Sequence, residues 1–477
     1  MLLTLFPSLK ENKIVNFLSK MYYSKYYIFF IGICVFLCHA LSFEIPFFYG
    51  VVFVGVIIPT LLCHDLIAHI PPLAMTYSSI SLKANNTRFE TSIVSGSNKT
   101  HLIIIVAIIL VCFISRLVFD LVTKKERRVK PALLLGYAFL GPCYLLGGVL
   151  TSYYKADTLI YGLATFLSVS ACYFLILYLV DWKKVPKSYY AWLMTAYGLV
   201  VAAEVFFIVI QIQSGNKEYI SWHDQIFTGW GMRNNIAGQI VLCVAAPVYL
   251  AIKSKKFAWI FLLLPFVMLT GSLLTNSRAG SLFSLIVIVI ALVIYFKKCD
   301  KNQLYQCFGV LATVLLGSLV VFIIKREEVV NLLARFFEKK PDISNTSDFL
   351  QYRDIIWHHG INHFLESELF GVGFYQCVDY RFLNFSTSFV PARYHNIYIQ
   401  FLASTGILGL AAFLYHRYQS LYLTFKNPSL EKTFIYLSIL GLFLCSIVDN
   451  NFFNFGPGLN YCIALAFIEG LCIAETK

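Results

Sequence analysis

Long apolar runs recur along almost the whole sequence, and they constrain the fold more than any other feature. About thirteen of these runs are long enough to cross the hydrocarbon core of a bilayer. They lack the alternation of a barrel strand, and lipid offers backbone groups no partner, so the runs must be helices. Of the 477 residues, 58% are apolar and 13% are charged, which excludes a soluble core. We therefore predict an all-α, polytopic membrane protein with about 12 to 14 transmembrane helices, in one integral membrane domain over residues 1–477.

The order of the runs predicts which segments share a side of the membrane. The predicted spans cover residues 27–43, 46–63, 102–122, 131–153, 158–180, 190–212, 236–252, 257–274, 279–296, 305–324, 397–415, 434–448 and 459–474. A segment near 66–82, interrupted by Pro71 and Pro72, is a further helix or a re-entrant segment.

The positive charge follows the loops between the spans. The net charge of +13 comes from Lys and Arg in short loops at every second crossing, so it is a signal of membrane orientation and not of nucleic-acid binding. Basic loops at 124–130, 183–184, 253–256, 297–301 and 416–426 are predicted to be cytoplasmic. The alternate connections are then external, and the largest of them is the loop 325–396.

Several polar residues at the ends of the predicted spans are candidates for chemistry. Arg233 opens one span, and Arg278 joins two others in Thr275-Asn276-Ser277-Arg278-Ala279-Gly280. A guanidinium at the membrane interface can bind a phosphate through two hydrogen bonds, or it can simply bind lipid headgroups. Glu204 lies deep in its span, where a charge is costly, and it either faces a polar cavity or has only a structural role.

Histidines in the predicted external loop are candidates for metal ligands or for a base. No carboxylate accompanies His358, His359 and His363 at the spacing of a zinc protease motif, and the 13 cysteines form no metal pattern, so no metal is predicted. His395 lies at the entry of a helix, close to Arg393. It is either a base at the membrane surface or an ordinary interfacial residue.

The order of the motifs resembles the O-antigen ligase and O-antigen polymerase superfamily of bacterial envelope glycosyltransferases. The motifs are Gly229-Trp230-Gly231-Met232-Arg233-Asn234-Asn235, the segment around Arg278, Arg353, Gly371-Val372-Gly373, His395-Asn396 and Gly406-Ile407-Leu408-Gly409-Leu410. The resemblance covers residues 229–410 by motif and the rest of the chain only by hydropathy.

The resemblance implies a helical, GT-C-like glycosyltransferase fold in the bacterial inner membrane, with its active site facing the periplasm or the cell exterior. It implies an undecaprenyl-diphosphate-linked glycan donor and no metal or other cofactor. Direct attack on such a donor in one displacement would invert the anomeric centre. Arg278 and Arg353, with Arg233, correspond to donor-binding arginines, and His395 corresponds to the catalytic histidine. Arg393, Asn396, Lys155 and Asp449 are supporting candidates.

The acceptor remains open at this point. A ligase uses a lipid A core sugar and a polymerase uses a second lipid-linked repeat, while transfer to a protein hydroxyl is a third variant. The alternative from another class is a transporter or flippase of lipid-linked glycans. A transporter would depend on charges deep in helices, such as Glu204, instead of the external His395.

The basic loops on either side of residues 325–396 predict that this segment lies outside the cytoplasm. A cysteine in place of Ser347, in a variant without native cysteines, should react with an impermeant thiol reagent in intact cells whose outer membrane, if present, is permeabilised. Labelling that requires rupture of the inner membrane would reverse the predicted orientation.

Overall fold

A computed structural model describes most of the chain. The described residues are 12–41, 49–63, 66–76, 98–123, 130–152, 154–215, 226–228, 230–327, 330, 353–374, 377–378 and 391–475. Ser347 and much of the predicted external loop, including 331–352 and 379–390, lie outside them.

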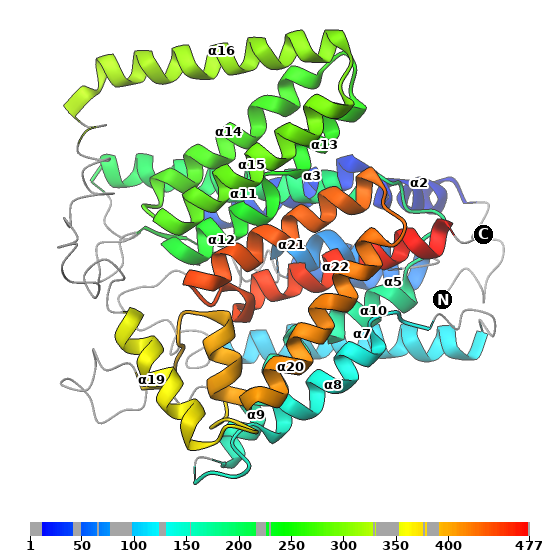
Figure 1. Cartoon of the computed structure of the whole chain (residues 1–477). Coiled ribbons are helices and arrows are strands. Elements are labelled where there is room, and N and C mark those ends of the chain that lie inside the picture. Colours follow the sequence, from blue (N-terminus) through cyan, green and yellow to red (C-terminus); the bar gives the residue numbers. More distant parts are fainter. Residues whose placement is uncertain are drawn as a thin grey trace.

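Helices make up nearly all of the described structure (Figure 1). The first half contains α2 (Lys13–Tyr22), α3 (Lys25–Leu41), η2 (Phe53–Ile57), α5 (Ile58–Leu62), η3 (Ile67–His69), η4 (Pro72–Thr76), α7 (Asn98–Thr123), α8 (Leu134–Leu146), α9 (Ala156–Ser168), α10 (Ala171–Leu179) and α11 (Tyr189–Gln213). The second half contains α12 (Arg233–Cys243), α13 (Ala246–Lys253), α14 (Ala258–Leu274), α15 (Arg278–Lys298), α16 (Lys301–Ile324), α19 (Arg353–Glu366), α20 (Ile397–Phe425), α21 (Leu430–Val448), η7 (Asn451–Phe453) and α22 (Phe455–Glu475). Two antiparallel pairs of two-residue strands join β1 (Phe227–Thr228) to β2 (Gly231–Met232) and β3 (Cys377–Val378) to β4 (Pro391–Ala392).

The structure confirms the all-α, polytopic class. Within the described residues, eight helices are long and apolar enough to cross a membrane, and the bent pair α2–α3 makes a ninth if it forms one span. Each of the eight overlaps a predicted span. The other predicted spans also fall on helices: the bent pair, α7, and three shorter apolar helices at 49–62, 134–146 and 258–274. The predicted number of about 12 to 14 is reached only if α7 and the shorter helices also count as spans. By length and composition alone, the described residues contain eight spans, or nine with the bent pair.

The most buried span carries a candidate residue at its first position. The span formed by α12 and α13, which begins at Arg233, is 89% buried, and the span formed by α22 is 78% buried. By contrast, α16 is only 11% buried and lies along one edge of the bundle (Figure 1). Arg233 is therefore the first residue of the helix that packs most deeply in the bundle.

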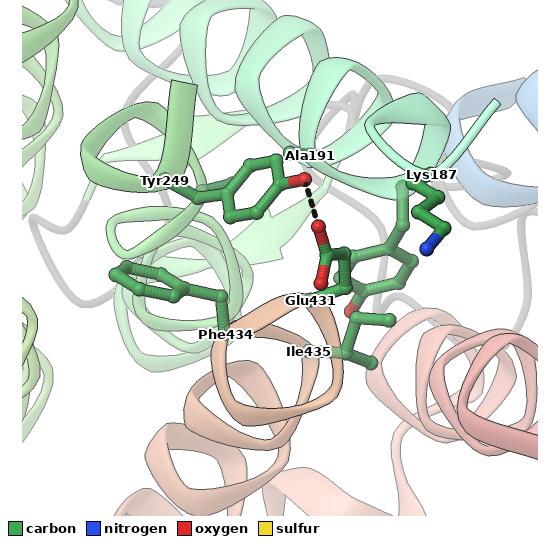
Figure 2. Close-up of a pocket in the computed structure, with 8 residues that line it drawn as sticks. Lys187, Ala191, Tyr249, Glu431, Phe434 and Ile435 are labelled. Atoms are coloured by element: carbon green, nitrogen blue, oxygen red, sulfur yellow. Dashed lines mark hydrogen bonds between the residues drawn. The ribbon is translucent and has the colours of Figure 1, made fainter. Parts of the chain in front are cut away.

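The helix α21 connects two chemically different ends of the bundle. Near its first residue, Glu431 accepts a hydrogen bond from the Tyr249 hydroxyl at 2.9 Å, at the edge of a small pocket (Figure 2), and pairs with Lys253 at 3.0 Å. Directly after its last residue, Asp449 lies 4.0 Å from Arg353. At 1.5 Å per residue, the 19 residues of α21 span about 28 Å, close to the thickness of the hydrocarbon core. The Lys253 end and the Arg353 end are therefore far enough apart to lie at opposite faces of a membrane.

The helix α20 is broken at Gly406, whose φ of 65° and ψ of −166° are essentially accessible only to glycine. Unpaired backbone groups are costly within a membrane, and the segment 368–373 supplies the missing partners. The hydrogen bonds run from Val372 N–H to Ala403 O (2.7 Å), from Gly373 N–H to Ser404 O (3.0 Å) and from Ile407 N–H to Glu368 O (2.8 Å). This pairing fixes the first turns of α20, which directly follow His395.

The break predicts that Gly406→Ala destabilises the protein by at least about 2 kcal/mol. A Cβ at this position would lie 2.3 Å from the carbonyl carbon of Leu369, and the backbone conformation is disfavoured for alanine. The matched control is Gly317→Ala within α16, where a Cβ meets nothing within 4 Å. Thermal unfolding of both purified variants in detergent checks this, and equal midpoints for the two would contradict the assigned role of Gly406.

Candidate functional site

Several helices begin at the Arg353 end of the bundle, around residues singled out in the sequence. Arg233, Arg278 and Arg353 are the first residues of α12, α15 and α19. Helix starts leave backbone N–H groups without intrahelical partners and carry partial positive charge. These arginines therefore add their charge to ends that already favour anions.

The structure brings the three arginines together, although they are far apart in the sequence. Arg233 interacts electrostatically with both Arg278 and Arg353, and also with Asp449. We call Arg233, Arg278 and Arg353 the arginine cluster. Its members repel one another, so an anion with several oxygens, which each guanidinium can bind through two hydrogen bonds, would stabilise the cluster.

A histidine–carboxylate pair lies beside the arginine cluster. The Nδ1 of His395 is 2.9 Å from Oδ1 of Asp449, and Oδ2 of Asp449 faces Nη2 of Arg353 at 4.0 Å. The Asp449 side chain is 14% exposed and the His395 side chain is 32% exposed. Burial alone would raise the pKa of Asp449, but His395, Arg353 and Asn234 outweigh it and lower this pKa to about 2. The carboxylate is therefore ionised at neutral pH.

The backbone at His395 has a φ of 51°, a left-handed conformation that few non-glycine residues adopt. Neighbouring contacts hold it. The Arg393 guanidinium donates to the Asn454 side chain and to the Asn450 carbonyl, and the Tyr394 N–H donates to Gln400 Oε1 at 3.2 Å. On the other side, Asn396 caps α20. Asn396 and Arg393 thus position the segment that carries His395.

A network of amide side chains surrounds this pair, and no sequence motif predicted a role for it. Asn234 accepts a hydrogen bond from Ser277 Oγ at 2.9 Å, and it is one of the neighbours that lower the pKa of Asp449. Asn454 donates to Asn235 Oδ1 at 2.6 Å. The only sequence signal was the density of amides at the ends of two spans, in Arg233-Asn234-Asn235 and in Asp449-Asn450-Asn451.

Two predicted candidates do not join this group of residues. Lys155 is exposed just before α9, and no ion pair or hydrogen bond within the described part of the chain involves its side chain. Glu204 is 3% exposed, and its carboxylate lies 2.8 Å from Nδ1 of His39 on α3. The ring of His39 in turn contacts Trp230 at a centroid distance of 5.6 Å. Glu204 therefore supports the hairpin that precedes Arg233.

The histidines of α19 have different surroundings from His395. Nδ1 of His363 lies 2.6 Å from the Tyr394 hydroxyl, which ties α19 to the segment before His395. Burial and the neighbouring His359 lower the pKa of His363. Across the described ranges, no three His, Cys, Asp or Glu side chains are placed to hold a metal ion.

Comparison with known proteins gives one family match. Residues 263–414 match the family model described as O-antigen ligase. This range includes Arg278, Arg353 and His395, while Arg233 and Asp449 lie outside it. No curated protein matches the chain. The match confirms, over residues 263–414, the resemblance inferred from the motifs.

Proposed function

We propose that this protein is a membrane glycosyltransferase that transfers an undecaprenyl-diphosphate-linked oligosaccharide or polysaccharide to an acceptor hydroxyl. One observation carries the proposal: the arginine cluster lies directly beside the His395–Asp449 pair. The match to O-antigen ligase over residues 263–414 supports the same class of reaction.

The arginine cluster suits the donor diphosphate. As the bond between the sugar C1 and the phosphate oxygen breaks, its electron pair moves onto the diphosphate, which gains negative charge. Fixed guanidinium groups at helix starts stabilise developing charge without rearranging during the reaction. The members lie on α12, α15 and α19, so three separate helices set their relative positions.

The histidine–carboxylate pair suits the acceptor hydroxyl. Because ionised Asp449 only accepts hydrogen bonds, the Nδ1 of His395 donates to it, which leaves Nε2 of a neutral imidazole with a free lone pair. The acceptor oxygen attacks C1 while its proton passes to Nε2. A single displacement of this kind inverts the anomeric centre, and the energy comes from the donor bond.

The charges at the two ends of the bundle indicate on which side of the membrane the proposed reaction takes place. Lysines such as Lys253 and Lys298 lie at the helix ends opposite to the arginine cluster. By the positive-inside rule, this distribution supports a cluster that faces the periplasm or the cell exterior. The polyprenyl tail of the donor would then stay in the bilayer while the sugar lies outside. Ligase and polymerase share this chemistry and differ only in whether a lipid A core sugar or a second lipid-linked repeat is the acceptor.

A lysine cannot reproduce the planar pair of donors that a guanidinium offers, so Arg278→Lys and Arg353→Lys should each weaken binding of a short polyprenyl diphosphate. We expect a loss of roughly 10- to 100-fold in affinity for farnesyl diphosphate. Calorimetric titration of the full chain in lipid nanodiscs measures it. The control is Arg326→Lys, an exposed position after α16 that should bind like wild type. Unchanged affinity in both cluster variants would refute diphosphate binding there.

His395→Ala should lower the transfer rate by roughly two to four orders of magnitude, because it removes the proton acceptor. Binding of farnesyl diphosphate and the thermal midpoint should stay near wild type, since the imidazole acts mainly in the transition state. Raising the pH should partly restore the rate of the variant. The rate is measured as transfer from undecaprenyl-diphosphate-linked oligosaccharide extracted from cells that carry the gene.

The exposed His358 on α19 provides the control for this experiment. His358→Ala should transfer at the wild-type rate. A stable His395→Ala protein with near-normal transfer would remove His395 from the mechanism.

A further inference from the structure

We propose that Gln400 is a positioning residue for the His395–Asp449 pair. Its amide oxygen holds together the residue before His395 and the residue after Asp449, and so aligns the imidazole with the carboxylate. The inference rests on the proposed function, because this pair is the base of that reaction. Gln400 lies near the start of α20 and is 1% exposed, so it acts on the reaction without contacting substrate.

One oxygen atom of Gln400 accepts hydrogen bonds from two separate segments. The Tyr394 N–H donates to Gln400 Oε1 at 3.2 Å, and Nδ2 of Asn450 donates to the same atom at 2.7 Å. A backbone N–H can only donate, so the Gln400 atom that meets it must be the oxygen. The Asn450 atom that meets this oxygen must then be its NH₂ group. The partners thus define the orientation of both amides.

The Gln400 side chain is itself fixed at its other end. Its Nε2 donates to Ser404 Oγ at 2.8 Å, one turn later on α20, and its backbone N–H donates to the Asn396 carbonyl at 2.8 Å. The Ser404 carbonyl in turn accepts the N–H of Gly373 from the segment 368–373. The accepting oxygen of Gln400 therefore has a defined position, against which the two segments are aligned.

This alignment matters because the base is assembled from two distant parts of the chain. The 2.9 Å contact between His395 and Asp449 joins residues that are 54 positions apart. Tyr394 directly precedes His395 and Asn450 directly follows Asp449, so Gln400 connects the two segments one residue away from the pair on each side. Proton transfer is sensitive to such geometry, since a misplacement of about 1 Å can lower a rate roughly 100-fold.

Gln400→Met tests the inference because methionine has a similar length and lacks the accepting oxygen. With undecaprenyl-diphosphate-linked oligosaccharide as the donor, kcat of the full chain should fall by roughly 10- to 100-fold while KM for the donor stays near wild type. The thermal midpoint should also fall, because two buried donors lose their acceptor. Stability alone therefore does not distinguish a positioning role from a structural one.

A double-mutant cycle with Asp449→Ala makes that distinction. A residue that acts by aligning His395 with Asp449 has nothing to align once the carboxylate is removed, so Gln400→Met should then change kcat by no more than about twofold. A structural role would lower kcat by the same factor in both backgrounds. That result, or an unchanged kcat in the single variant Gln400→Met, would overturn the inference.

Asn450→Ala is a milder second variant, which guards against misfolding of Gln400→Met. It removes the donor on the Asp449 side and leaves the hydrogen bond from Tyr394 to Gln400 in place. Its kcat should fall as well, and this loss should also disappear in the Asp449→Ala background. A stable Asn450→Ala protein with wild-type kcat would show that the connection through Gln400 does not align the base.

Gln303 provides the matched control at the opposite end of the bundle. It is 3% exposed, and its Nε2 donates to the carbonyls of Ala251 and Ile252, both at 3.0 Å. Gln303→Met should therefore lower the thermal midpoint and keep the wild-type kcat. If His395→Ala is inactive while Gln400→Met is fully active, this inference alone fails; if His395→Ala is fully active, the proposed function fails as well.

Discussion

The contacts of the partly buried Asp449 carboxylate are the interactions on which the site depends. Asp449 follows α21 directly and faces Arg353, His395 and Asn234, which come from three other parts of the fold. A charge that is largely removed from water is costly without partners, so these contacts constrain one another. The carboxylate also offsets part of the repulsion within the arginine cluster. The positive charge that remains is what makes this end of the bundle suited to an anion.

A second constraint is that backbone hydrogen-bonding groups within a membrane need partners, and it applies to the break in α20. A helix that bends at Gly406 leaves backbone groups unpaired, and the segment 368–373 pairs with them. This segment follows α19, the helix that starts with Arg353. The same hydrogen bonds that repair the break therefore connect the helix carrying an arginine of the cluster to the helix that follows His395. The position of the segment 368–373 is thus tied to the need for paired backbone groups within a membrane.

Features that depend on residues close together in the sequence could be predicted, whereas contacts between residues far apart in the sequence could not. Apolar runs are local, so the spans overlapping the eight long helices were found with small errors at their ends. The arginines and His395 were found because their motifs resemble a family, not because their spacing shows that they meet. Contacts between residues far apart in the sequence produce no local pattern. Ser277 hydrogen-bonds to Asn234 across 43 positions, and His39 pairs with Glu204 across 165. For the same reason Glu204 had no visible partner, and the asparagines at the span ends could not be distinguished from ordinary interfacial residues.

The charge balance of the site explains why arginines alone can serve the proposed reaction. The donor diphosphate carries less negative charge while it is bound to the sugar than after it has left. Guanidinium groups whose charge is only partly offset by Asp449 therefore bind the departing diphosphate more strongly than the intact donor, which is the direction that lowers a barrier. On the other side of the reaction, the same Asp449 holds the imidazole with its lone pair free for the acceptor proton. In the proposed reaction, one carboxylate would thus limit how strongly the site holds its donor and define the base that activates its acceptor.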